Sequence, residues 1–121
     1  MKKTLKLKKN YEFKRILTKG KYYSGKYLDV FVTNNNENIN RIGIAVGVKV
    51  AKAVKRNRIK RLIYENYRLL EDNLESGYKI VFLWKKKQDI KEATFYNIKD
   101  DMIKVLKRIG ILQWKRLLFF W

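Results

Sequence analysis

The chain of 121 residues carries 30 Lys and Arg against 11 Asp and Glu, which gives a formal net charge of +19. A field of that size attracts polyanions, nucleic acid above all and an anionic membrane second, whereas solubility alone requires a net charge of only about 2–8 on a small domain. Cys and His are both absent, so the composition excludes disulfides, zinc fingers, a Cys nucleophile and a His base.

The length predicts a single domain over residues 1–121 with one modest core. Apolar residues form 46% of the chain, which is too many for a disordered basic tail. No uncharged apolar run approaches the roughly 20 residues that span a bilayer. The first ten residues, MKKTLKLKKN, lack the apolar core of a signal peptide. We therefore expect a cytoplasmic protein.

The N-terminal part of the chain predicts a basic arm followed by a short helix. Residues 1–9 alternate Lys with Thr and Leu and are interpreted as a loose arm. Asn10 can cap a helix that runs through Thr18 and stops at Gly20. Three apolar residues share one face of this helix at spacings of three and four: Phe13, Ile16 and Leu17.

The stretch from Tyr22 to Thr33 is rich in aromatic and β-branched residues and predicts a single strand. Alternation gives this strand a core face made of Leu28, Val30 and Val32. The opposite face is mixed polar and aromatic and is expected to be open, with Tyr27, Asp29, Phe31 and Thr33. Phe31 is there either a lone exposed aromatic or a stacking platform for a base.

Two further strands and a last helix complete the expected order of elements. An Asn-rich turn over residues 34–40 leads into a strand over residues 41–47. The run YKIVFLW, residues 78–84, is nearly continuously apolar and predicts a central strand covered on both faces. A helix opens at Ala93 or Thr94 and ends at Gly110. The order indicates an α+β sandwich of a small sheet and helices.

Positive charge concentrates in the stretch from Lys49 to Arg68, KVAKAVKRNRIKRLIYENYR, which predicts a helix from about Lys52 to Leu70. At about 100° per residue, one side of this helix is apolar, with Ile59, Leu62, Ile63, Tyr67 and Leu70. The opposite side carries Asn57, Arg61, Tyr64 and Arg68, with Arg58 and Lys60 on its flanks. Such a helix is buried on one side and offers the other side to an anion.

The residues from Arg41 to Arg61 read RIGIAVGVKVAKAVKRNRIKR. This order resembles the basic signature of the bacterial ribonuclease P protein component, in which an Arg-x-Gly-x-x-Val strand and a loop precede a helix carrying Arg-Asn-Arg and Lys-Arg. The stretch LKKNYEFKRILTKG resembles the first helix of the same family. The likeness extends over about residues 5–109.

The resemblance implies an αβββαβα fold with an unusual left-handed βαβ crossover. It also implies an RNA-binding subunit of the ribonucleoprotein that removes 5′ leaders from precursor tRNA. The RNA subunit would supply the active site, and Mg²⁺ would be held by that RNA and the substrate, so no residue of this chain is expected to be catalytic or to bind a metal. The expected partners are ribonuclease P RNA and precursor tRNA, with no membrane and no small-molecule substrate.

The resemblance further implies two sets of binding residues. The set for the RNA subunit joins the signature with neighbouring cations: Lys52, Arg56, Asn57, Arg58, Lys60, Arg61 and Arg68. The set for a cleft that takes the leader is Phe13, Leu17, Phe31 and Lys49. Asn57 suits a 2′-hydroxyl or a base edge, but it can equally bond its own helix.

The chain departs from the family pattern at three positions. An Arg is frequent where Tyr64 stands, which favours stacking in place of an ion pair at that position. Val48 lacks the positive charge that the family commonly has there, and Leu17 replaces a frequent aromatic residue.

Four other functions stay open on the sequence alone. The basic helix could enter a DNA major groove, and a ribosome-associated protein would share the charge and size. The apolar tail over residues 111–121, ILQWKRLLFFW, could lie in a membrane interface, although docking on the core or on a second copy is favoured. An autonomous nuclease would need Glu92, Asp100 and Asp101, which fit better as the start and solvent face of the last helix.

Overall fold

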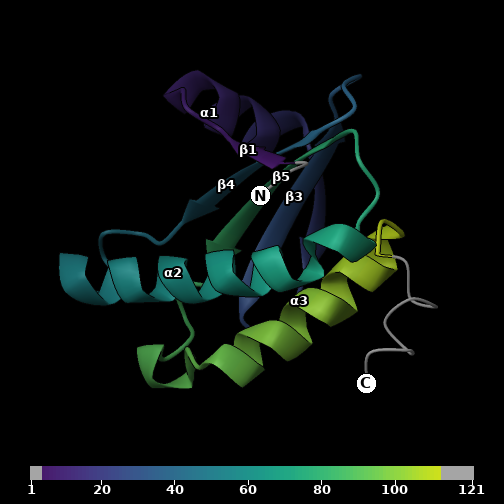
Figure 1. Ribbon diagram of the computed structural model, residues 1–121. Helices are drawn as coiled ribbons and strands as arrows, with labels where there is room; N and C mark the ends of the chain where they lie inside the picture. Colours follow the sequence, from purple (N-terminus) through teal and green to yellow (C-terminus); the bar gives the residue numbers. More distant parts are fainter. Residues whose placement is uncertain (1–3, 113–121) are drawn as a thin grey trace.

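The computed structural model describes residues 4–112, which form one mixed five-stranded sheet and three α-helices (Figure 1). The strands are β1 (Thr4–Lys6), β2 (Lys21–Ser24), β3 (Leu28–Asn34), β4 (Asn40–Ala45) and β5 (Tyr78–Trp84). The helices are α1 (Asn10–Lys19), α2 (Ala53–Leu70) and α3 (Phe95–Ile109), with short 3-10 turns η1 (Glu71–Asn73) and η2 (Ile90–Glu92). The α+β prediction is confirmed, and the order after β1 is αβββαβα.

The sheet has the strand order β1-β4-β5-β3-β2, so β5 lies at its centre as its continuous apolar run predicts. β4 runs parallel to β5, and α2 makes the crossover between them. β3 runs antiparallel to β5 and to β2. The left hand of the β4–α2–β5 crossover stays a prediction of the resemblance.

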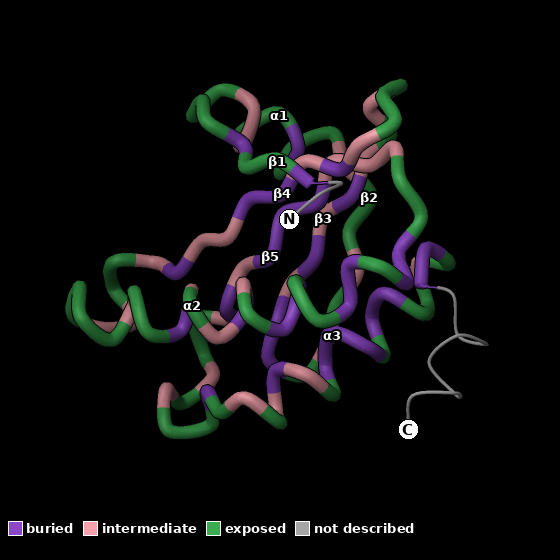
Figure 2. The backbone as a smooth tube through the Cα atoms, in the orientation of Figure 1, coloured by how far each residue is buried: buried purple, intermediate pink, exposed green. Residues whose placement is uncertain are grey.

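Helices cover both faces of the sheet, with α1 on one face and α2 and α3 on the other (Figure 1). Alternation along β5 explains why both faces are buried. Ile80, Phe82 and Trp84 enter the main core on the side of α2 and α3, whereas Val81 enters a smaller core beneath α1. Figure 2 accordingly shows the central strands as mostly buried and the outer turns of the helices as exposed.

The predicted single strand from Tyr22 to Thr33 is wrong, because the chain turns between residues 24 and 28 and makes the antiparallel hairpin β2–β3. A buried carboxylate on α3, that of Asp101, accepts the backbone N–H groups of the turn and so ends the strand. Tyr27 stacks on Trp84 in the main core, with ring centroids 5.8 Å apart, and does not lie on the open face. The predicted core face of β3 is confirmed.

The predicted loose arm over residues 1–9 is also wrong where the structure describes it. Residues 4–6 form β1, which pairs in parallel with β4. The Leu7 N–H donates to the carbonyl of Ile42 at 2.8 Å, and the Thr4 hydroxyl lies 2.8 Å from the buried hydroxyl of Tyr67. Asn10 is the first residue of α1 and not its cap, since Lys9 precedes it in extended backbone.

The last helix agrees with its predicted ends. The Thr94 hydroxyl accepts a hydrogen bond from the Asn97 N–H, and Gly110 closes the helix at a φ of 90°. Ile111 and Leu112 are buried in the main core. The rest of the apolar tail, residues 113–121, lies outside the described residues. Within residues 4–112, no helix has the length and apolar character needed to cross a membrane.

Candidate nucleic-acid interface

Helix α2 is amphipathic, as its sequence predicts. Its buried residues are Ile59, Ile63, Asn66, Tyr67 and Leu70. Asn66 is a polar member of that side, which the apolar pattern of the sequence did not predict. Its amide donates to the carbonyls of Leu62 at 3.0 Å and Phe95 at 3.2 Å, which ties α2 to the start of α3.

The residues predicted to bind the RNA subunit all lie on or directly before α2. Exposed side chains are Lys52, Asn57, Arg58, Arg61 and Arg68, while those of Arg56 and Lys60 are half-buried. Arg56 also has a structural contact, because its Nη1 donates to the carbonyl of Ala51 at 2.7 Å at the start of the helix. Glu65 is the sole acidic residue of α2. The exposed side of this helix therefore carries mainly positive charge.

Two of the predicted cleft residues meet beneath α1. Phe13 and Phe31 pack against the small core of Leu7, Ile16 and Val81. A Cβ atom at Gly43 would lie 2.3 Å from the nearest ring carbon of Phe13, so this ring rests directly on the backbone of β4. The close approach requires glycine at position 43.

Tyr22 extends the aromatic surface at Phe31, although the sequence pattern did not indicate it as a site residue. The two rings lie opposite each other across β2 and β3, with centroids 5.1 Å apart. Tyr22 is 53% exposed, and its hydroxyl donates to Asp29 at 2.7 Å. Recognition of the hairpin would have placed Tyr22 beside Phe31, but the single-strand interpretation concealed this pairing.

The other two predicted cleft residues do not join that cluster. Leu17 is 38% exposed and lies outside the small core of Leu7, Ile16 and Val81. Lys49 is exposed in the turn between β4 and α2, where the Val50 N–H donates to the Gly47 carbonyl at 3.0 Å.

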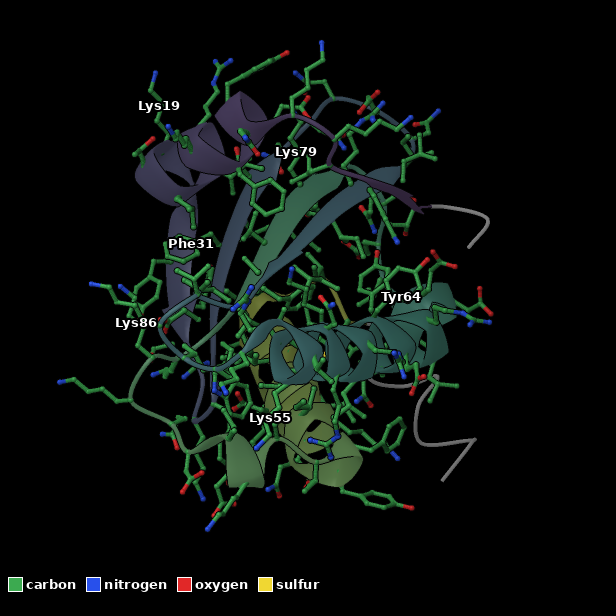
Figure 3. All side chains as sticks on the ribbon, turned by 90° about the vertical axis from the view of Figure 1, so that its left-hand side faces the viewer. Lys19, Phe31, Lys55, Tyr64, Lys79 and Lys86 are labelled. Carbon is green, nitrogen blue, oxygen red and sulfur yellow. The ribbon has the colours of Figure 1, made fainter. Side chains whose placement is uncertain are left out.

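A cavity of about 360 Å³ lies at the edge of β4, between α1 and α2. Phe13 reaches it from α1, and Asn57, Lys60 and Arg61 reach it from α2. The remaining lining residues are Lys6, Leu7, Ile42, Gly43, Ile44 and Tyr64. In Figure 3, Tyr64 lies on the side of α2 that faces β1, at the right of the sheet, and Phe31 lies at the left of the sheet.

The carboxylates considered for an autonomous nuclease do not form a reactive group. Asp101 is buried and accepts the backbone N–H groups of Lys26, Tyr27 and Leu28 at 2.7–2.9 Å. The prediction that Asp101 lies on the solvent face of α3 is therefore wrong. No group of three or more His, Cys, Asp or Glu residues that could hold a metal occurs among residues 4–112.

Comparison with known proteins gives consistent matches over most of the chain. The family model described as Ribonuclease P matches residues 1–110. The ribonuclease P protein component of Natranaerobius thermophilus is 41% identical over 107 residues, which cover 88% of this chain and 91% of that protein. The corresponding protein of Clostridium botulinum strain Langeland is also 41% identical, over 88% of this chain and 95% of its own length.

Solved structures agree with the sequence matches. The RNase P protein of Staphylococcus aureus superposes with a TM-score of 0.78 at 30% identity, covering 88% of this chain and 96% of that one. The RNase P protein of Thermotoga maritima gives a TM-score of 0.77 at 29% identity, covering 86% and 96%. The topology described above is therefore shared with both proteins.

Proposed function

The chain belongs to the ribonuclease P protein family, and from this premise we propose that two of its surfaces bind two different RNA molecules. As a ribonuclease P protein component, it is a subunit of the ribonucleoprotein enzyme that matures the 5′ end of tRNA, and its partner is the ribonuclease P RNA. The exposed side of α2 binds that RNA. The aromatic surface beneath α1 binds the single-stranded leader of precursor tRNA.

The charge of α2 supports the first assignment. Arg58, Arg61 and Arg68 are exposed on a helix whose other side is held in the core. Guanidinium groups bind phosphate oxygens in a bidentate way, and structured RNA is recognised mainly through its shape, phosphates and 2′-hydroxyls. A rigid cationic helix suits that kind of contact.

The pairing of Tyr22 with Phe31 is the observation that carries the second assignment. Two rings on a partly open sheet face give unpaired bases a surface on which to stack. Phe13 continues the apolar surface beneath α1. Duplex RNA keeps its bases stacked inside the helix and gains little from such rings, whereas a single-stranded leader exposes its bases.

We assign catalysis to the RNA subunit and Mg²⁺ to the RNA and substrate. The buried carboxylate of Asp101 is occupied by three backbone N–H donors. When bound, Mg²⁺ supplies the activation of water and the neutralisation of phosphate charge. This chain contributes binding and orientation of the RNA strands. Since it acts on tRNA precursors, we place it in the cytoplasm.

The test measures the affinity of the ribonuclease P RNA for precursor and mature tRNA, with and without the full chain. We expect the chain to raise the affinity for tRNA that carries a leader far more than the affinity for mature tRNA. Equal gains for the two substrates would contradict leader binding. Failure of the chain to bind the ribonuclease P RNA would contradict the assignment of α2.

A further inference from the structure

The cavity of about 360 Å³ at the edge of β4 is lined by both apolar and polar side chains. A phosphate backbone alone would contact only the polar ones. The apolar part of the lining comes from Leu7, Phe13, Ile42 and Ile44, and its polar rim comes from Lys6, Asn57, Lys60 and Arg61. The volume lies near the lower end of the range of about 300–1,000 Å³ that is usual for small-ligand sites. A flat ring with a polar edge and an attached phosphate matches this combination.

The backbone of β4 offers hydrogen bonds to the same cavity. The pairing of β1 with β4 stops at Lys6 and Ile42, and the Leu7 N–H to the Ile42 carbonyl is its last bond. Alternate residues of a strand point their N–H and C=O groups to the same side. The backbone N–H and C=O of Ile44 therefore face the cavity and do not pair with a neighbouring strand. Backbone groups at an open sheet edge are unpaired in this way.

Tyr64 provides an aromatic wall at this position. Its half-buried ring lines the cavity, and the Lys6 ammonium lies 4.5 Å from the ring centroid. Lys60 and Arg61 stand about one helical turn from Tyr64 and bring positive charge to the rim. Every base has a ring face that can stack on such a side chain.

We propose that this cavity binds a single unstacked nucleobase of the RNA subunit. The base packs against Tyr64 and the apolar lining, its polar edge bonds the N–H and C=O of Ile44, and its phosphate meets Lys60 or Arg61. This inference rests on the proposed binding of α2 to the RNA subunit. It adds a base-binding site to a surface otherwise made for phosphates.

The first test measures the affinity of ribonuclease P RNA for the full chain and for Tyr64→Ala and Tyr64→Phe over a range of salt concentrations. We expect Tyr64→Ala to weaken binding about 5- to 150-fold, as loss of one stacked base does. The salt dependence should stay unchanged, because Tyr64 carries no charge. Tyr64→Phe keeps the ring and should stay within about twofold of the unchanged chain.

Two outcomes of that measurement would overturn the base site while leaving the proposed function intact. One is wild-type affinity in Tyr64→Ala. The other is a loss in Tyr64→Ala with a lower salt slope, which would mean that phosphate contacts were lost. If the unchanged chain fails to bind the ribonuclease P RNA, that result contradicts the proposed function as well as the base site.

A second measurement does not depend on a variant. The full ¹⁵N-labelled chain is titrated with AMP, GMP, CMP and UMP, and with ribose 5-phosphate as a matched probe that lacks a base. We expect at least one nucleotide to shift the amide signals of Ile44 and Asn57, and ribose 5-phosphate to leave Ile44 unmoved. If no nucleotide shifts Ile44, or if ribose 5-phosphate shifts it equally, the base site is wrong.

Discussion

The carboxylate of Asp101 accepts a hydrogen bond from the backbone N–H of Tyr27 at 2.9 Å, although 74 positions separate the two residues along the chain. The same carboxylate accepts from the N–H groups of Lys26 and Leu28. A Cβ atom at Gly25 would lie 2.6 Å from both carboxylate oxygens. Helix α3 thus clamps the β2–β3 turn, and this turn sets the register that brings Tyr22 beside Phe31.

We predict that Asp101→Ala lowers the free energy of unfolding by about 3 kcal/mol or more, because it leaves buried N–H donors without an acceptor. Urea unfolding of the free protein measures this loss. Asp100→Ala is the matched control, since Asp100 is exposed on the same helix, and its effect should stay within about 0.5 kcal/mol. Equal losses in the two variants would show that the clamp does not stabilise the fold.

The Tyr67 hydroxyl makes stability depend on alkaline pH. Burial raises its pKa above the ordinary value of a tyrosine hydroxyl, while hydrogen bonds with Thr4 and Asn40 oppose the rise. A raised folded-state pKa gives stability that is fully present below the unfolded pKa and is lost as pH rises through the folded pKa. The unchanged chain should therefore lose stability above about pH 10.

We predict that Tyr67→Phe costs about 1 kcal/mol at pH 7, because the Thr4 hydroxyl loses its partner. Above about pH 10 the difference from the unchanged chain should shrink, since Phe has no proton to lose. Urea unfolding at pH 7, 9, 10 and 11 measures the two curves. Tyr11→Phe is the control, because Tyr11 is 62% exposed. A constant difference between the two chains across this range would refute the prediction.

The sequence predicted α2 and β5 closely because each pattern is local. The apolar side of α2 repeats at helical spacing, and β5 is a continuous apolar run, so neither depends on a distant partner. The signature from Arg41 to Arg61 likewise lies within one stretch of chain. Its assignment to RNA-binding residues stays a prediction.

The features that the sequence did not reveal depend on contacts between distant residues. The break between β2 and β3 is stabilised by Asp101, and no residue near Tyr27 in the sequence predicts a contact with that carboxylate. β1 exists because it pairs with β4, some 36 residues further along the chain. The cavity at Ile44 arises where that pairing stops, so its position requires the register of the sheet.

Because Gly43 lies directly against Phe13, a side chain added at position 43 should change the aromatic surface beneath α1. We predict that Gly43→Ala displaces the Phe13 ring, lowers stability by about 1–3 kcal/mol, and weakens binding of precursor tRNA more than of mature tRNA. Urea unfolding and substrate affinity of the reconstituted enzyme measure the two effects.

The control for this prediction is a double-mutant cycle with Phe13→Ala, which removes the ring that the added methyl group meets. Adding Gly43→Ala to Phe13→Ala should cost much less stability than adding it to the unchanged chain. Fully additive losses would mean that the methyl group clashes with something other than Phe13.

The exposed guanidinium groups of α2 are predicted to contact RNA phosphates. Arg58→Ala and Arg61→Ala should each weaken binding of the RNA subunit and reduce the slope of log affinity against log salt by about one. Filter binding at several salt concentrations gives both quantities. Lys91→Ala, an exposed cation of η2, serves as the control and should change neither. Unchanged slopes in both Arg variants would exclude them as phosphate contacts.

Phe31 lies on the sheet face beneath α1, half-buried against the small core, with Tyr22 on its open side. We predict that Phe31→Ala weakens binding of precursor tRNA by about 1–3 kcal/mol, the usual cost of losing one stacked base, and leaves mature tRNA nearly unaffected. Tyr96→Ala is the matched control, because Tyr96 is a 71% exposed aromatic residue on α3. The truncation also removes part of the small core, so the unfolding free energy is measured in parallel. Only a loss confined to the leader-bearing substrate supports stacking, because a structural defect weakens both substrates alike.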